Sequence, residues 1–239
     1  MSAALSTQDK TPLDKFGWNT VAKQILSPII LGAIIFALAG TMDWFWGWVF
    51  NIVHVGVWLA MTLVLWRANP ELLNARGKQG KGTKTWDVIL LSIYGIAWIL
   101  MIVLGALDFR YGWTGDVAPL VHILGNLLII LGFGLTIWSM VVNRSFELTV
   151  RIQAEREHKV IDDGPYQYVR HPGYTGTILA FYFGMPMALG SWIAFVIGLI
   201  GLVTMVVRTA MEDRTLQAEL PGYVAFTQKT RYRLVPGLW

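Results

Sequence analysis

Six long apolar stretches constrain the fold of this chain more than any other feature of its sequence. They cover residues 25–42, 47–66, 86–107, 118–142, 174–189 and 191–207. Each approaches or reaches the roughly 17–25 residues that a helix needs to cross hydrocarbon. Only 14% of the residues are charged, against about 25% in an ordinary soluble domain. The pattern predicts an all-α polytopic integral membrane protein with about six transmembrane segments.

The connections between these stretches differ in character. The last two stretches are short and nearly touch, which predicts a helical hairpin that turns at Gly190. The segment 67–85 is rich in Gly and Lys and is interpreted as a flexible connector. The segment 143–173 is different, because residues 151–169 mix charged residues, a Gly-Pro step and aromatic residues and lead directly into the fifth stretch.

The distribution of basic residues predicts an orientation. Eighteen of the 19 Lys and Arg residues fall on one side of the six segments, and Arg110 alone falls on the other. Basic loops stay in the cytoplasm, so both termini are expected there. The net charge of +4 is therefore attributed to loops that face anionic membrane lipids, and no nucleic-acid partner is expected.

Several classes of site are excluded or disfavoured. The chain contains no cysteine, which rules out disulfides, thiolate nucleophiles and cysteine-ligated zinc. His54 and His122 lie inside apolar segments without a neighbouring ligand at useful spacing. We expect them to pack or to hydrogen-bond between helices, and no metal is expected.

Two polar motifs flank the predicted hairpin. The first reads Gly164-x-Tyr166-x3-Arg170-His171-Pro172-x-Tyr174-x-Gly176, and the second reads Arg208-Thr-x2-Glu212-Asp213-x2-Leu216. Residues four apart share one helix face, so Arg208 and Glu212 are expected to project together from a helix that continues out of the last segment. The alternative is that Arg208 reaches toward headgroups with Glu212 as a surface partner, a pair worth under about 1 kcal/mol.

Together the two motifs resemble the isoprenylcysteine carboxyl methyltransferase family, over about residues 143–239. The resemblance implies S-adenosyl-L-methionine as cofactor, S-adenosyl-L-homocysteine as product, and a lipophilic or prenylated acceptor. It implies a catalytic region over 143–239, and the four apolar stretches before it predict an N-terminal membrane region of four helices over 1–142. Carried over by position, it implies that the cofactor is bound by Gln153, His158, Lys159, Val160, Ile161, Tyr166, Arg170, His171, Pro172, Gly173, Tyr174 and Glu212. It makes Arg208 and Glu212 the catalytic pair, with Arg208 on the acceptor.

The chemistry of methyl transfer suits these residue types. Transfer from a sulfonium to an anion needs alignment and exclusion of water more than proton transfer. A guanidinium matches a carboxylate through two hydrogen bonds, so Arg208 is expected to orient the acceptor carboxylate and Glu212 to pair with the cofactor's amino group. The soluble cofactor would enter from the cytoplasmic side, and the lipophilic acceptor from between the helices.

Other functions stay open at this point. Membrane sterol reductases resemble the same C-terminal region and use NADPH, so the cofactor that binds would separate the two enzymes. A transporter or scaffold is a further alternative, although the ionisable groups cluster at one membrane face. The acceptor atom could belong to a carboxylate, a thiol or an amine. A monomer is expected.

Overall fold

The computed structural model describes residues 12–76, 82–151 and 159–239, and every regular element in them is helical. The elements are α1 (Lys15–Ala39), α2 (Phe45–Ala68), α3 (Pro70–Arg76), α4 (Thr85–Tyr111), α5 (Pro119–Val142), η2 (Gly164–Gln167), α6 (Pro172–Thr177), η3 (Ile178–Gly184), α7 (Met185–Leu189), α8 (Trp192–Glu219) and α9 (Tyr223–Lys229). The predicted all-α fold is confirmed.

Five helices, α1, α2, α4, α5 and α8, are long and apolar enough to cross a membrane. The fifth predicted segment is a composite in which α6, η3 and α7 follow one another without a break over residues 172–189. At 1.5 Å per residue such a run is roughly 27 Å long. Its middle part, η3, is a π-helix, in which the amide of Met185 bonds to the carbonyl of Ala180 five residues earlier.

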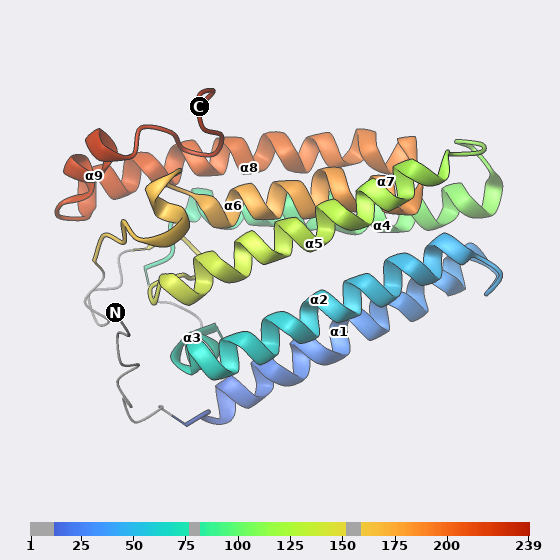
Figure 1. The fold of residues 1–239 in the computed structure, drawn as a ribbon, viewed down its shortest axis with the longest axis horizontal. Coiled ribbons are helices and arrows are strands. Elements are labelled where there is room, and N and C mark those ends of the chain that lie inside the picture. Colours follow the sequence, from blue (N-terminus) through green and yellow to red (C-terminus); the bar gives the residue numbers. More distant parts are fainter. Residues whose placement is uncertain (1–11, 77–81, 152–158) are drawn as a thin grey trace, which may run out of the picture.

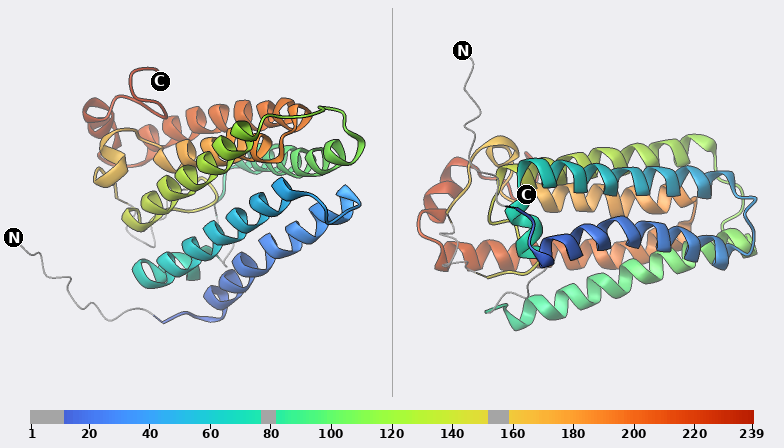
Figure 2. Two further views of the ribbon diagram at one scale, coloured as in Figure 1. Left: turned by 45° about the vertical axis from the view of Figure 1, so that its right-hand side comes forward. Right: turned by 90° about the horizontal axis from the view of Figure 1, so that it is seen from below.

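The long helices run side by side, with α1 and α2 as one pair and α4, α5, α8 and the run from α6 to α7 grouped above it (Figure 1). Helix α4 packs along α8, and α5 packs against α2 on one side and against α6, η3 and α7 on the other. Helices α3 and α9 and the segment that contains η2 all lie at one end of the bundle, as the two further views confirm (Figure 2). Polar segments distant in sequence therefore meet at this end.

The hairpin between α7 and α8 turns where the sequence predicts. Gly190 has a φ of +69°, which a residue with a Cβ rarely adopts. The Ser191 hydroxyl accepts a hydrogen bond from the amide of Ala194 and donates one to Asp108 of α4. A Cβ added to Gly125 of α5 would lie 2.2 Å from the Ala188 amide nitrogen. The absence of a side chain there brings α5 against the hairpin.

Two expectations about the N-terminal half need correction. Helix α1 begins at Lys15 and not near residue 25, because the Asp14 carboxylate accepts the amides of Phe16 and Gly17 at 2.9 Å. The interpretation of 67–85 as a flexible connector is wrong for its first half, which forms α3. Local sequence carries the signal for α3, since Pro70 stands at its first position.

Candidate functional site

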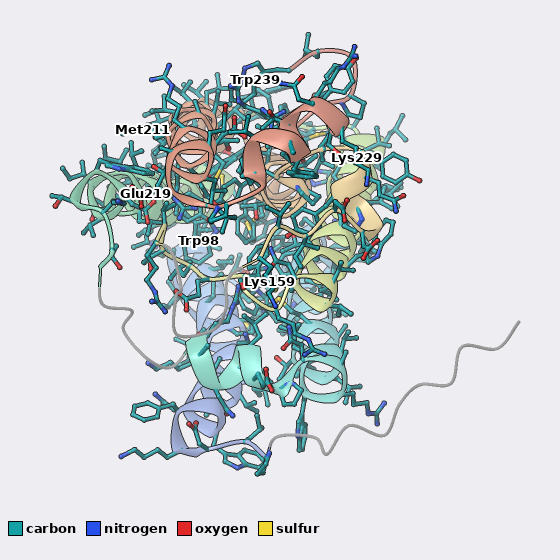
Figure 3. The ribbon with its side chains drawn as sticks, turned by 90° about the vertical axis from the view of Figure 1, so that its left-hand side faces the viewer. Trp98, Lys159, Met211, Glu219, Lys229 and Trp239 are labelled. Carbon is teal, nitrogen blue, oxygen red and sulfur yellow. The ribbon has the colours of Figure 1, made fainter. Side chains whose placement is uncertain are left out.

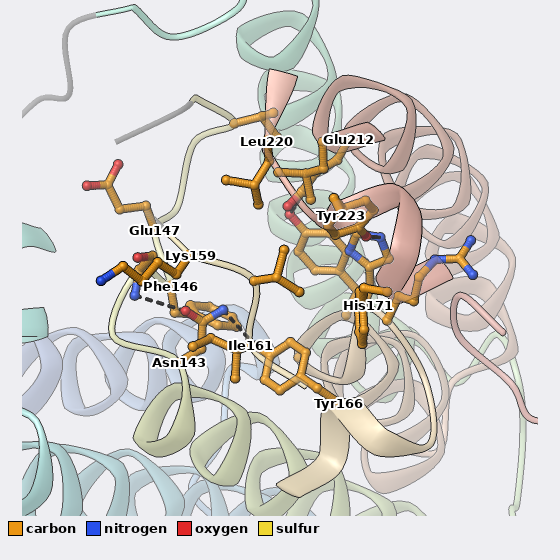
Figure 4. Close-up of a pocket in the computed structure, with 18 of the residues that line it drawn as sticks. Asn143, Phe146, Glu147, Lys159, Ile161, Tyr166, His171, Glu212, Leu220 and Tyr223 are labelled. Carbon is orange, nitrogen blue, oxygen red and sulfur yellow. Dashed lines mark hydrogen bonds between the residues drawn. The ribbon is translucent and has the colours of Figure 1, made fainter. Parts of the chain in front are cut away.

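Two cavities lie at the end of the bundle that carries α3 and α9, which Figure 3 views end-on with Lys159 and Lys229 labelled. The first, called the polar cavity, has about 760 Å³ of empty space counted with its opening. The segment 143–151 forms one side of it, and the side chains of Glu212, Tyr223 and Leu220 form the other (Figure 4). Its lining therefore comes from both halves of the predicted catalytic region.

The second, called the apolar cavity, has about 960 Å³ of empty space counted in the same way. It lies among α2, α4, α5, the α6–η3 run and α8, and most of its wall is aromatic or aliphatic. These apolar residues are Trp58, Met61, Leu91, Trp98, Phe133, Met140, Phe146, Leu148, Ala180, Phe181 and Met205. Such a wall suits a hydrocarbon chain.

Tyr174 belongs to the wall that the two cavities share, together with Phe146 and Glu147. Its hydroxyl donates a hydrogen bond to Glu212 and accepts one from Arg208 Nη1 at 2.6 Å. Its ring stacks on that of His171, with 5.6 Å between the centroids. The two residues predicted from their four-residue spacing are thus joined through a third predicted residue.

A buried ion pair fixes Arg208. Its Nε donates to Asp87 Oδ1 at 2.7 Å, and its Nη2 donates to the Leu148 carbonyl at 2.7 Å. Asp87 is 0% exposed and also accepts the amide of Val150 at 2.7 Å. Sequence reasoning missed Asp87, although a carboxylate inside the apolar stretch 86–107 was a signal, because such a group requires a partner.

Asp213 organises the other side of the site. It is 0% exposed and accepts Arg170 Nε at 2.7 Å, Arg233 Nε at 2.9 Å and the Tyr223 hydroxyl at 3.0 Å. Arg170 Nη1 donates in addition to the carbonyls of Thr230 and Arg231. Asp213 therefore ties the C-terminal segment to the first motif, a role that its presence in the second motif did not reveal.

The predicted cofactor residues are distributed as follows. The polar cavity is lined by Lys159, Val160, Ile161, Tyr166, Arg170, His171, Gly173, Tyr174 and Glu212. Pro172 is buried as the first residue of α6 and does not line the cavity, and Arg208 lines the apolar cavity. Gln153 and His158 lie outside the described residues. Leu216 of the second motif lines it as well, and lining residues that the motifs did not indicate include Asn143, Phe146, Leu220, Tyr223 and Phe226.

The chemistry of the polar cavity fits S-adenosylmethionine. Glu212 offers a carboxylate for an ammonium group, and Val160, Ile161 and Leu216 offer apolar surface for a ring system. Burial raises the pKa of Tyr166, whose hydroxyl accepts a hydrogen bond from Asn143 Nδ2 at 3.1 Å. Tyr166 thus stays a neutral phenol near neutral pH.

Residues 120–220 match the model of the phospholipid methyltransferase family. This is a family of membrane methyltransferases related to the isoprenylcysteine carboxyl methyltransferases. The match runs from α5 to the end of α8 and contains both motifs. Together with the five apolar helices it supports an integral membrane protein, and it indicates a methyltransferase. No curated protein matches the chain.

Proposed function

We propose that this protein transfers a methyl group from S-adenosylmethionine to a lipophilic acceptor at the wall between its two cavities. The position of Tyr174 carries the proposal, since this residue lines both cavities and is bonded to Glu212 on one side and to Arg208 on the other. A soluble donor in the polar cavity and a lipid in the apolar cavity would meet there.

Glu212 is assigned to the cofactor. Its carboxylate lines the polar cavity and would pair with the cofactor's amino group, while His171, Tyr166 and the run from Lys159 to Ile161 would surround the remainder. When bound, S-adenosylmethionine supplies an electrophilic methyl group on a sulfonium, which a carboxylate takes without any proton transfer. The basic loops support a cytoplasmic position for the polar cavity and for both termini.

Arg208 is assigned to the acceptor. Four of its five N–H groups are bonded to Asp87, Leu148 and Tyr174. The remaining N–H on Nη1, on a side chain that lines the apolar cavity, can donate to an acceptor oxygen. By the resemblance of its motifs, the favoured acceptor is the carboxylate of an isoprenylcysteine-like molecule.

The description of the matching family favours a phospholipid as a second acceptor, and an amine is one of the acceptor groups that the sequence leaves open. A protonated amine is no nucleophile, so this reaction needs a base beside the nitrogen. Glu147 and Glu212 are carboxylates in the wall of the polar cavity, and Glu147 also faces the apolar cavity. Either would have to take up that proton.

The product separates the two acceptors. Purified protein in membranes would be incubated with methyl-labelled S-adenosylmethionine, and the extracted lipids treated with alkali. A methyl ester releases labelled methanol, which is volatile, whereas an N-methyl group stays on the non-volatile amine of the headgroup. Absence of any labelled lipid with a range of membrane extracts would contradict the methyltransferase.

Cofactor binding tests the assignment of Glu212. Glu212→Ala should weaken binding of labelled S-adenosylmethionine by tenfold or more, because hydrogen bonds to charged groups contribute about 1.5–3 kcal/mol. Glu219→Ala is the matched control, since Glu219 lies on the same helix and pairs only at the surface with Lys84, at 2.7 Å. Equal affinity of the Glu212 variant and the wild type would remove Glu212 from this role. Binding of NADPH in place of S-adenosylmethionine would favour the reductase.

A further inference from the structure

Arg76 is a half-buried cation that has no counter-charge among the residues that the structure describes. It is the last residue of α3, and its side chain lines the apolar cavity. Its Nε is buried and has no hydrogen-bond partner among the described residues. The guanidinium lies 5.8 Å from the centroid of the Phe146 ring, which faces both cavities. Arginine side chains that are withdrawn from water are normally paired with an anion, so we expect an anion to bind beside Arg76.

The other charged groups of the apolar cavity already have partners. Arg208 is paired with Asp87. Glu147 accepts Nε and Nη2 of Arg151, both at 2.8 Å. Burial lowers the pKa of Arg76 to about 10, so its side chain is still charged at neutral pH. Within the described chain, the cavity therefore holds an uncompensated positive charge.

The helix that carries Arg76 is firmly attached to the bundle. Leu72 and Leu73 are 0% exposed. The Asn74 side chain accepts the amide of Asp14 at 3.0 Å and donates to the Pro12 carbonyl at 3.1 Å. The Asn69 side chain donates to the Met140 carbonyl at 3.0 Å. Because these contacts are made by side chains within α3 and by Asn69 just before it, the backbone of Arg76 is held in place relative to the cavity.

We propose that Arg76 binds the oxyanion of an acidic lipid whose hydrocarbon chain fills the apolar cavity. This inference rests on the proposed function and narrows it, because it makes the acceptor an acidic lipid. A carboxylate and a phosphate present the same pair of oxygens to a guanidinium. A neutral or cationic headgroup would leave the charge of Arg76 uncompensated.

The position of Arg76 also suits the reaction. Arg208 is bonded to the carbonyl of Leu148, and Arg76 lies against Phe146 two residues earlier. Both arginines thus border the cavity along the same short segment, which is part of the wall toward the cofactor. A headgroup on Arg76 is therefore held on the side of the cavity where the methyl group would arrive.

Binding of three amphiphiles with the same chain tests the proposal. Oleate, oleoyl lysophosphatidate and oleyl alcohol would be titrated, below their micelle concentrations, against full-length protein in nanodiscs of neutral lipid. We expect the wild type to prefer at least one acid over the alcohol by about tenfold or more. Arg76→Gln should lose this preference and keep its affinity for the alcohol.

Arg76→Lys should keep a reduced preference for the acid, because lysine retains the positive charge but lacks the paired N–H donors of a guanidinium. Arg67→Gln, at an exposed position on α2, should bind like the wild type.

Each outcome decides a point. The tighter of the two acids distinguishes a carboxylate lipid from a phosphate lipid. A wild type that binds acid and alcohol alike would overturn the proposal without any variant, as would an Arg76→Gln protein that still prefers the acid. S-adenosylmethionine binding, measured on the same samples, keeps the two proposals apart. If the protein prefers the acid but does not bind S-adenosylmethionine, only the methyltransferase is contradicted. If it binds S-adenosylmethionine but does not prefer the acid, only the role of Arg76 is contradicted.

Discussion

The Arg208 guanidinium donates a 2.6 Å hydrogen bond to the Tyr174 hydroxyl, and this hydroxyl donates in turn to Glu212. The three groups come from α6 and α8 and bridge the wall between the polar and apolar cavities. One phenol thus holds a cation that borders the apolar cavity and an anion that borders the polar cavity. Their opposite charges suit the proposed carboxylate acceptor and the amino group of the proposed cofactor.

Removal of this phenol should affect turnover more than folding. Tyr174→Phe keeps the ring that stacks on His171, so the melting temperature should stay close to that of the wild type. Glu212 and Arg208 lose their shared partner, and we expect methyl transfer to fall by about 10- to 100-fold. The measurement is kcat with saturating cofactor. Tyr168→Phe, at a position 63% exposed in the same segment, is the control, and an unchanged kcat in Tyr174→Phe would contradict the assignment.

Asp213 should be the most sensitive position for stability. Asp213→Asn replaces a fully buried acceptor of two arginines and a tyrosine. Loss of one partner from a buried charge cluster costs about 3–5 kcal/mol, so unfolding in denaturant should begin at much lower concentration. Asp162→Asn serves as control because its pair with Lys229 is at the surface, and it should unfold like the wild type. Equal midpoints for both variants would argue against Asp213 as the centre of the site.

Without a bound lipid, the wild type should be less stable than a variant that has a neutral side chain in place of Arg76. Because burial lowers its pKa to about 10, the folded chain holds this proton less tightly than the unfolded chain. The charged side chain therefore reduces stability at neutral pH. Arg76→Gln should raise the free energy of unfolding by about 1 kcal/mol, since part of the gain is lost with the packing of the arginine stem.

Ligand and pH dependence complete this prediction. Oleate should raise the melting temperature of the wild type and leave that of Arg76→Gln nearly unchanged. Its affinity for the wild type should be steady at neutral pH and fall as the pH rises through about 10, where Arg76 loses its proton. An Arg76→Gln protein that is clearly less stable than the wild type in the absence of lipid would contradict this account.

The orientation can be tested because the chain has no cysteine of its own. Asp116→Cys places a thiol in the exposed connection between α4 and α5, and Gln228→Cys places one on α9 at the opposite end of the bundle (Figure 1). A membrane-impermeant maleimide applied to intact cells should label the first and not the second. Permeabilised cells should label both. The reverse pattern would place the polar cavity outside the cytoplasm.

The features that follow from local sequence could be predicted. The apolar stretches predict the helices, Gly190 predicts the hairpin turn, and the spacing of Arg208 and Glu212 places both on one face of α8. These inferences need only helical periodicity and turn chemistry. The residues from Lys159 to Tyr174 that line the polar cavity were indicated only by the family resemblance.

The features that depend on packing between distant segments could not be predicted from the sequence. Asp87 and Arg208 are 121 residues apart, and nothing local indicates which acid an arginine in α8 will meet. Arg76 belongs to a short helix in a connection whose Gly and Lys content suggested no structure. The apolar cavity is formed by side chains of helices that are far apart in the sequence, so no contiguous motif marks it.

The number of residues in η3 sets the rotation of α6 about its own axis, and so the direction in which Tyr174 points. A π-helix holds more residues in each turn than an α-helix, and one residue more or less rotates the adjoining helix by roughly 100°. The far end of the hairpin is fixed by the bond between Ser191 and Asp108. Any such rotation would therefore fall on α6 and turn Tyr174 away from Arg208. A chain shortened by one residue within η3 would retain every residue of both motifs and yet point a different side chain at the dividing wall.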